Sequence, residues 1–216
     1  MKTCWWAIAG LALFGAAPAA AQTQLPNTGP VEHREARTSF PERVDEYRRV
    51  SAVAYNPEGT DLSAAYRVQG ADGPLLITVY IYPAALHEVQ PAGDVAACRR
   101  HFGATADAVT GANTTARRRP QSEPLAAPPV RRDLSHRAVF DVTRHANWSG
   151  PFVSQLDVYC YVGGTWIVKY RTTSTPGLDP AKAVETFVRS GPWPGRVMPD
   201  SVAGNGAAPP DTRAAR

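Results

Sequence analysis

A pair of adjacent glycines, Gly163 and Gly164, separates two runs of alternating apolar and polar residues. The runs cover residues 153–162 (VSQLDVYCYV) and 165–172 (TWIVKYRT). Alternation with a period of two is typical of β-strands whose two faces meet different surroundings. Two glycines between such runs predict a tight hairpin, because a type I′ turn needs positive φ angles at both central residues. This feature restricts the fold strongly, since it requires antiparallel strands in the second half of the chain.

Other segments have the composition of β-strands as well. The strongest covers residues 75–82 (LLITVYIY), which are dense in β-branched and aromatic side chains and end at a proline. Residues 47–55 and 62–68 precede it, and turn residues separate the three segments. Residues 137–143 (RAVFDVT) alternate in the same way before the hairpin. Short turns between neighbouring strands favour an antiparallel meander.

Two segments predict helices. Asp94 is a candidate N-cap for a helix that reaches about Val109, along which apolar residues recur at steps of three and four. Asp179, followed by Pro180 at the first helical position, predicts a shorter helix. The expected fold class is therefore α+β, with a single antiparallel sheet of about six strands and one long and one short helix packed on it.

The composition divides the chain into a leader, a folded part and two flexible ends. Residues 1–21 are expected to be a signal peptide, and residues 22–39 a flexible lead. Residues 40–195 form one predicted domain, which a Pro- and Arg-rich loop interrupts at residues 114–132. Residues 196–216 are rich in Ala, Gly and Pro and are expected to be a disordered tail.

The leader has the layout of a cleavable secretory signal. Lys2 supplies a positive charge, residues 4–17 are uninterruptedly apolar, and small residues at 19–21 offer a cleavage site. A membrane anchor is the alternative, but this apolar run is shorter than the roughly 20 residues needed to span a bilayer. We therefore expect a periplasmic or secreted protein with no stable membrane span after cleavage.

The charge of the chain argues against a nucleic-acid partner. Removal of the leader would lower the net charge from +4 to +3, because Lys2 is the only charged residue in it. This excess is too weak to favour nucleic acid. Arginines gather at residues 117–119 and 131–132, and we interpret them as solvated charges on a loop. Contact with an anionic envelope component or an envelope protein is the alternative.

Two cysteines, Cys98 and Cys160, remain after removal of the leader. Cys98 belongs to the apolar face of the long predicted helix, and Cys160 shares a strand face with Leu156, Val158 and Val162. If that helix packs on that sheet, the two residues can form a disulfide, which is stable in an oxidising compartment. A bridge closing a loop of about 60 residues would stabilise the fold by roughly 4 kcal/mol. Two unpaired buried thiols are the alternative.

None of the common catalytic or metal-binding motifs is present in the sequence. It lacks a G-x-S-x-G elbow, an H-E-x-x-H motif and a Gly-rich phosphate loop. No two of its five histidines have the i, i+4 spacing of a helical metal site. We therefore predict no catalytic residue, no metal ligand and no cofactor, and an enzyme is the less favoured class.

One group of side chains is a candidate binding surface. Its aromatic members alternate with apolar residues on two predicted strands, and its basic members share one face of the last strand. If these faces coincide, they would suit an anionic or glycan-like ligand or a protein partner. The alternative is that a helix covers the face and the tyrosines are ordinary packing. The candidates are Tyr80, Tyr82, Tyr159, Tyr161, Lys169 and Arg171.

Three stretches carry a resemblance to known proteins. They are residues 78–83 (TVYIYP), residues 165–173 (TWIVKYRTT) with a W-x-V-K-Y-R pattern, and the closing Trp193-Pro194. In this order of elements, residues 40–195 resemble small secreted bacterial α+β domains and the PsbP-like fold of an extrinsic photosystem subunit. The resemblance implies an antiparallel sheet flanked by helices and a non-catalytic accessory or binding role. It transfers no functional residue.

The leading functional hypothesis is an exported, non-enzymatic domain that binds a partner or ligand of the cell envelope. Export and the lack of a catalytic motif both favour it. One alternative is a periplasmic hydrolase with a dispersed active site that uses His101, His136 or His145. Another is a purely structural envelope protein.

Overall fold

The computed structural model of this chain describes residues 22–70, 73–87, 89–120, 130–144 and 150–198. The predicted signal peptide lies outside these residues. So do residues 199–216 of the predicted tail and residues 121–129 of the predicted loop.

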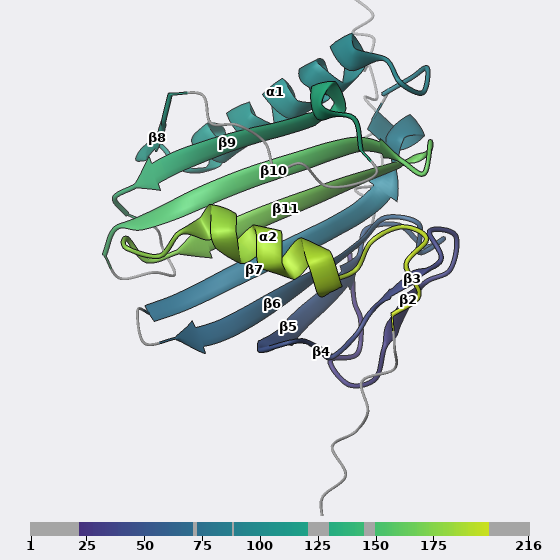
Figure 1. Ribbon diagram of the computed structural model, residues 1–216, viewed down its shortest axis with the longest axis horizontal. Coiled ribbons are helices and arrows are strands. Elements are labelled where there is room, and N and C mark those ends of the chain that lie inside the picture. Colours follow the sequence, from purple (N-terminus) through teal and green to yellow (C-terminus); the bar gives the residue numbers. More distant parts are fainter. Residues whose placement is uncertain (1–21, 71–72, 88, 121–129, 145–149, 199–216) are drawn as a thin grey trace, which may run out of the picture.

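Among the described residues, nine antiparallel strands form one large sheet, and two short strands form a second (Figure 1). The prediction of a single sheet of about six strands is therefore wrong. The six predicted strands form the body of the large sheet, and three strands of only two or three residues pair with its outer members. The nine are β1 (Thr23–Gln24), β4 (Arg43–Val44), β5 (Tyr47–Ala54), β6 (Leu62–Gly70), β7 (Gly73–Pro83), β8 (Ala116–Arg118), β9 (Ser135–Val142), β10 (Phe152–Val162) and β11 (Trp166–Ser174).

The large sheet consists of two meanders that meet at its centre. Strands β5, β6 and β7 are neighbours in sequence and in space, and so are β9, β10 and β11. The last strand of each meander pairs with the other, which places Tyr80 of β7 directly opposite Lys169 of β11. The turn between β10 and β11 has positive φ angles at both Gly163 and Gly164, as the predicted hairpin requires.

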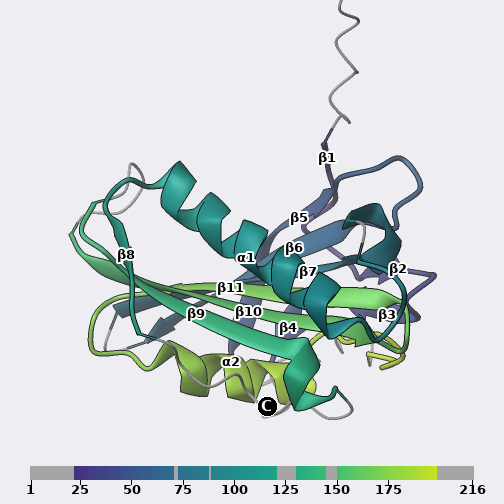
Figure 2. The ribbon, with the colours of Figure 1, turned by 90° about the horizontal axis from the view of Figure 1, so that it is seen from above.

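The two helices cover opposite faces of the large sheet (Figure 2). Helix α1 (Val95–Ala112) packs on one face and helix α2 (Pro180–Ser190) on the other. Both predicted N-caps are present, because the side chains of Asp94 and Asp179 each accept hydrogen bonds from the first turn of their helix. Alternate residues of each central strand therefore enter two different cores.

Residues 22–39, for which we expected a flexible lead, contribute secondary structure. They form β1 and the second sheet, which pairs β2 (Val31–His33) with β3 (Thr38–Phe40). His33 is completely buried, with its ring 4.8 Å from that of Trp166 in an edge-on arrangement. Burial lowers the pKa of His33, which packs here as a neutral side chain.

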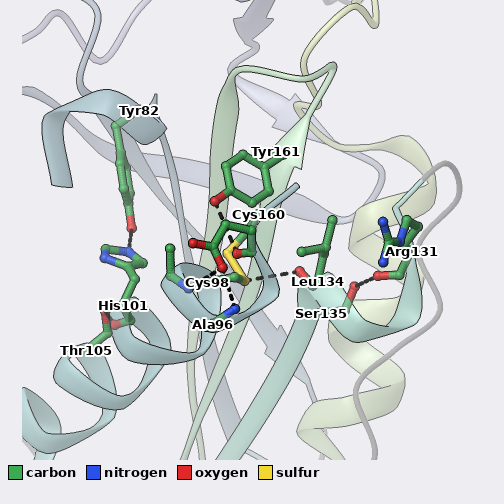
Figure 3. The surroundings of a disulfide bond; sticks show 12 residues. Tyr82, Ala96, Cys98, His101, Thr105, Arg131, Leu134, Ser135, Cys160 and Tyr161 are labelled. Carbon is green, nitrogen blue, oxygen red and sulfur yellow. Dashed lines mark hydrogen bonds between the residues drawn. A yellow bond between two sulfur atoms is a disulfide. The ribbon is translucent and has the colours of Figure 1, made fainter. Parts of the chain in front are cut away.

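A disulfide joins Cys98 in the first turn of α1 to Cys160 on β10 (Figure 3). This confirms the predicted pairing of the two apolar faces. Both residues are fully buried, and their Cα atoms are 6.0 Å apart. The sulfur of Cys98 also lies 3.6 Å from the backbone oxygen of Leu134, the last residue of the 3-10 turn η2 (Arg132–Leu134). The bridge therefore fastens the N-terminal end of α1 to β10, close to the C-terminal end of that strand.

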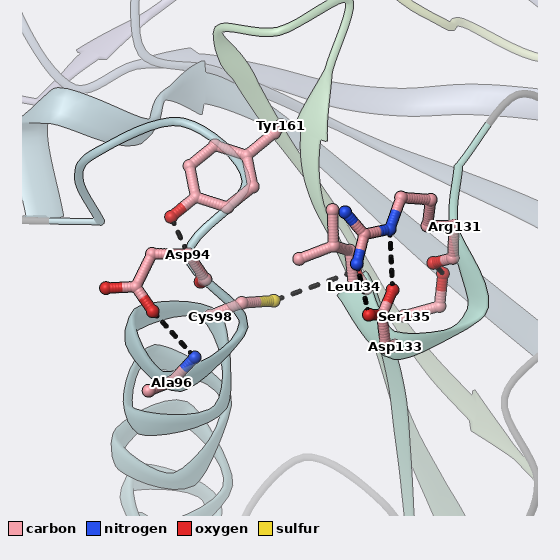
Figure 4. Close-up of polar contacts among 8 residues, drawn as sticks. All are labelled: Asp94, Ala96, Cys98, Arg131, Asp133, Leu134, Ser135 and Tyr161. Carbon is pink, nitrogen blue, oxygen red and sulfur yellow. Dashed lines mark hydrogen bonds and ion pairs between the residues drawn. The ribbon is translucent and has the colours of Figure 1, made fainter.

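A β-bulge lies beside this disulfide. The pairing of β10 with β11 is irregular between Tyr159 and Val162, and Tyr161 has a positive φ angle of 57°. Such an extra residue changes which face the following side chains occupy. As a result, Tyr159 and Tyr161, which we expected on one face, lie on opposite faces. The hydroxyl of Tyr161 donates a hydrogen bond to the backbone oxygen of Asp94, 3.2 Å away (Figure 4).

Candidate functional site

A cleft of about 380 Å³ opens between α1 and the adjoining face of the large sheet. We call it the Lys169 cleft. Its walls come from β7, β11 and α1, from the 3-10 turn η1 (Ala84–His87), and from the segment between β5 and β6. It has the size of a small-molecule site. It is lined by Tyr55, Asp61, Tyr80, Tyr82, His87, His101, Ala104, Thr105, Ala108 and Lys169.

Helix α1 forms one wall through a stripe next to its buried face. His101, Ala104, Thr105 and Ala108 recur at steps of three and four and therefore lie along one side of the helix. The alanines are exposed and short, which leaves the space that a larger side chain would fill. The helix thus packs on the sheet near its disulfide and still leaves a cleft beside the sheet.

The opposite wall brings together three of the predicted site residues. Tyr80 and Tyr82 are alternate residues of β7, so both side chains point to the α1 face of the sheet. Lys169 faces them from β11, with its Nζ atom 4.0 Å from the centre of the Tyr80 ring and 5.5 Å from that of Tyr82. These are cation–π contacts, which hold the amine against two aromatic faces.

Lys169 is partly buried, and its surroundings lower the pKa of its amine below that of an ordinary lysine. Burial, the largest effect, and the nearby guanidinium of Arg171 both lower its pKa, while the carboxylate of Asp61 raises it. The net result is a pKa of about 8. None of the ion pairs among the described residues involves Lys169. A fraction of this amine is therefore uncharged near neutral pH, and the charged form has no close carboxylate to pair with.

A cluster of rings forms the end of the cleft nearest the disulfide. The hydroxyl of Tyr82 lies 2.9 Å from Nε2 of His101 (Figure 3). The ring of His87 lies 4.8 Å from that of Tyr82 and 5.1 Å from that of His101. Burial raises the pKa of Tyr82 and lowers that of both histidines. This hydrogen bond therefore joins a neutral phenol to a neutral imidazole.

The fourth side of the cleft is more polar. Tyr55 lies with its ring 6.3 Å from that of Tyr80, and its hydroxyl lies 3.2 Å from Oγ of Ser63. Asp61 contributes a half-buried carboxyl group whose pKa is raised by burial and lowered by Lys169. The cleft therefore offers one cation, one carboxyl group and several aromatic faces.

The titration of His101 is the most direct test of this environment. Burial, then the neighbouring His87 and Lys169, lowers its pKa from 6.5 to about 4. We expect the imidazole proton signals of His101 in NMR spectra to titrate near pH 4, with His101→Gln used for assignment. Because the unfolded chain binds this proton near pH 6.5, the stability that neutral His101 contributes should fall as the pH decreases from 6.5 to about 4. A midpoint near 6.5 in the folded protein would contradict the ring cluster.

The remaining predicted surface residues lie elsewhere. Arg171 is on the same sheet face as Lys169 but borders a smaller cavity of about 50 Å³ near the C-terminal end of α1. Tyr161 is buried beside the N-terminal end of α1. Tyr159 is on the opposite face, 5.5 Å from the ring of Trp193. The structure therefore brings together Tyr80, Tyr82 and Lys169 from the predicted set.

Of the two described histidines in the alternative hydrolase hypothesis, one lines the Lys169 cleft and the other does not. His101 is in the Lys169 cleft, whereas His136 stacks on Phe102 with ring centres 5.1 Å apart. His145 lies outside the described residues. Within the described part of the chain, no three His, Cys, Asp or Glu residues are grouped closely enough to hold a metal ion.

Four cleft residues with polar side chains were not singled out from the sequence, namely Tyr55, Asp61, His87 and Thr105. Tyr55 and Asp61 flank a turn between two strands, and His87 ends a short 3-10 turn. Such positions have no periodic pattern that would show which way they face. Thr105 could have been placed beside His101 from the sequence, since it lies one helical turn after that residue on the predicted long helix.

Comparison of the chain with protein-family models, with curated proteins and with solved structures finds no match. The resemblance to the PsbP-like fold therefore stays a prediction. None of the helices among the described residues is both long and apolar enough to cross a membrane.

Proposed function

We propose that this chain is an exported ligand-binding domain, and that the Lys169 cleft binds a small organic anion with an aromatic ring. The observation that carries the proposal is the placement of Lys169 against the rings of Tyr80 and Tyr82. A carboxylate would find a cation without a competing ion pair, and a flat ring would find aromatic faces of matching shape.

The compartment is part of the same proposal. The leader predicts export to the periplasm or beyond, and the buried Cys98–Cys160 disulfide is compatible with an oxidising compartment. There the ligand would be an anionic component of the envelope or a small anion passing through it. The concave cleft favours a small ligand over the envelope protein that the sequence also allowed, because protein interfaces need far larger areas.

The carboxyl group of Asp61 narrows the ligand class. It shares the cleft with Lys169, so a second negative charge on the ligand would be repelled from this side. A hydroxyl or amino group at the same place could instead donate a hydrogen bond to it. The cleft therefore favours a monoanion whose other end is neutral and polar or apolar.

Benzoate is a suitable probe for this proposal, measured by isothermal titration calorimetry. Loss of a charged hydrogen bond costs about 1.5–3 kcal/mol, so Lys169→Met should weaken benzoate binding by at least about tenfold. Lys182→Met is the matched control, since Lys182 is exposed on α2, which covers the other face of the sheet. It should leave the affinity unchanged.

Two further ligands separate the contributions of charge and ring. Acetate keeps the carboxylate without the ring, and methyl benzoate keeps the ring without the charge. Both should bind more weakly than benzoate if Lys169 and the tyrosine faces act together. Equal affinities of the wild-type protein and Lys169→Met for benzoate would overturn the proposal.

A further inference from the structure

The amine of Lys169 is placed as a nucleophile as well as a cation. Its Nζ atom lies against two tyrosine rings inside a cleft that is open to small molecules. Amines react with carbonyl compounds only when they are neutral, and a lysine becomes neutral most readily in a partly dry site that lacks a close carboxylate. We propose that Lys169 captures aromatic aldehydes in this cleft as a reversible covalent imine. This inference rests on the proposed binding role of the same cleft and specifies its ligand class further.

The geometry supplies what each part of this reaction requires. The rings of Tyr80 and Tyr82 provide a surface on which an aromatic aldehyde can stack, with its carbonyl carbon toward Nζ. The cation–π contacts stabilise the charged amine, but burial and Arg171 oppose them, and the pKa of Lys169 is about 8. Near pH 8 about half of this amine is neutral, whereas a lysine with the ordinary pKa of about 10.4 is less than about 1% neutral.

The reaction needs no oxidant or reductant. The lone pair of Nζ attacks the carbonyl carbon, the carbon–oxygen π electrons move to oxygen, and that oxygen gains a proton while the nitrogen gives one up. The resulting carbinolamine loses its hydroxyl group as water while nitrogen gives up a proton, which leaves a carbon–nitrogen double bond. The cleft is open to solvent, so water can donate and accept the protons in these steps.

The lysine content of the chain makes a selective test possible. The sequence contains three lysines, which are Lys2 in the predicted leader, Lys169 in the cleft and Lys182 on α2. Lys182 is exposed and serves as an internal reference for ordinary lysine reactivity. Lys2 and the terminal amine fall on a separate peptide after digestion.

The probe is benzaldehyde, which has the ring of benzoate and places a carbonyl carbon where the carboxylate carbon would be. The full chain is incubated near pH 8 with benzaldehyde and cyanoborohydride, which reduces an imine to a stable benzylamine, and the adducts are located by peptide mass spectrometry. We expect benzylation of Lys169 to be at least about tenfold faster than that of Lys182, because of the larger neutral fraction. Excess benzoate should slow the reaction at Lys169 alone.

A conservative variant separates this inference from the binding role. Lys169→Arg keeps a cation in the cleft but has no amine that forms an imine, so it should retain benzoate binding and lose the adduct. Benzoate binding together with equal labelling of Lys169 and Lys182, or with no labelling, would overturn imine capture and leave the binding role intact. Rapid labelling of Lys169 without any benzoate binding would overturn the binding of anions instead.

Discussion

Replacement of both Cys98 and Cys160 by alanine should lower the free energy of unfolding by about 4 kcal/mol. The bridge spans a sequence separation of 62 residues, and the chain-entropy model gives a stabilisation of this size for such a loop. For a domain of this length, the melting temperature should fall by roughly 10 °C. Guanidinium unfolding followed by circular dichroism measures the difference.

The wild-type protein unfolded with and without a reducing agent is the control for this prediction. Reduction should produce a similar loss, because it removes the same crosslink from the unfolded chain. Intact mass after thiol labelling without reduction should show no accessible pair of thiols at these positions, even in denaturant. A loss below about 1 kcal/mol in the double variant, or two free thiols in untreated protein, would contradict the role of the bridge.

The same bridge should also matter for the Lys169 cleft. Cys98 lies one helical turn before His101, so the disulfide fixes the part of α1 that carries one end of the cleft. Loosening of this turn would separate His101 from Tyr82, to which it is hydrogen-bonded. We therefore expect the double alanine variant to bind benzoate more weakly even at temperatures where it remains folded.

The second large effect concerns a buried ion pair on the α2 side of the sheet. Nε of Arg137 on β9 lies 2.6 Å from Oδ1 of Asp157 on β10, and both side chains are more than nine-tenths buried. Gln155 donates a second hydrogen bond to Asp157. Asp157→Ala would leave a buried guanidinium without its counter-charge, which costs about 3–5 kcal/mol. Thermal and denaturant unfolding of this variant measure the loss.

A double variant distinguishes the loss of charge pairing from the loss of packing. Arg137→Met combined with Asp157→Leu removes both charges and keeps apolar volume, so it should recover most of the stability. The recovery is expected because Nη2 of Arg137 is buried without a hydrogen-bond partner in the described structure, so the guanidinium is incompletely satisfied. A double variant as unstable as Asp157→Ala would show that the charges themselves are not the cause.

Much of the central fold could be predicted from the sequence because its signals are local. Six strands, two capped helices and the glycine turn each have a repeated pattern or a specific turn chemistry within a few residues. The edge strands β1, β4 and β8 could not be predicted, because two or three residues carry no period and their structure depends on the neighbouring strand. This explains why the sheet is larger than expected.

The candidate site was predictable only in part, for related reasons. Alternation placed Tyr80, Tyr82 and Lys169 on definite strand faces, but only the pairing of β7 with β11 brings those faces together. The bulge at Tyr161 places Tyr159 and Tyr161 on opposite faces of the sheet instead of on one face. No local sequence pattern predicts such an extra residue. Turn residues such as Asp61 reach the cleft through tertiary packing alone.

The central claim is that small aromatic anions bind in the Lys169 cleft, and the location of binding tests it most directly. In NMR spectra of isotope-labelled protein titrated with benzoate, the largest shift changes should occur at Tyr80, Tyr82, His101 and Lys169. Signals of Lys182, on the helix that covers the opposite face of the sheet, should remain unchanged. The largest changes on that opposite face, or no saturable change at Lys169, would contradict the account.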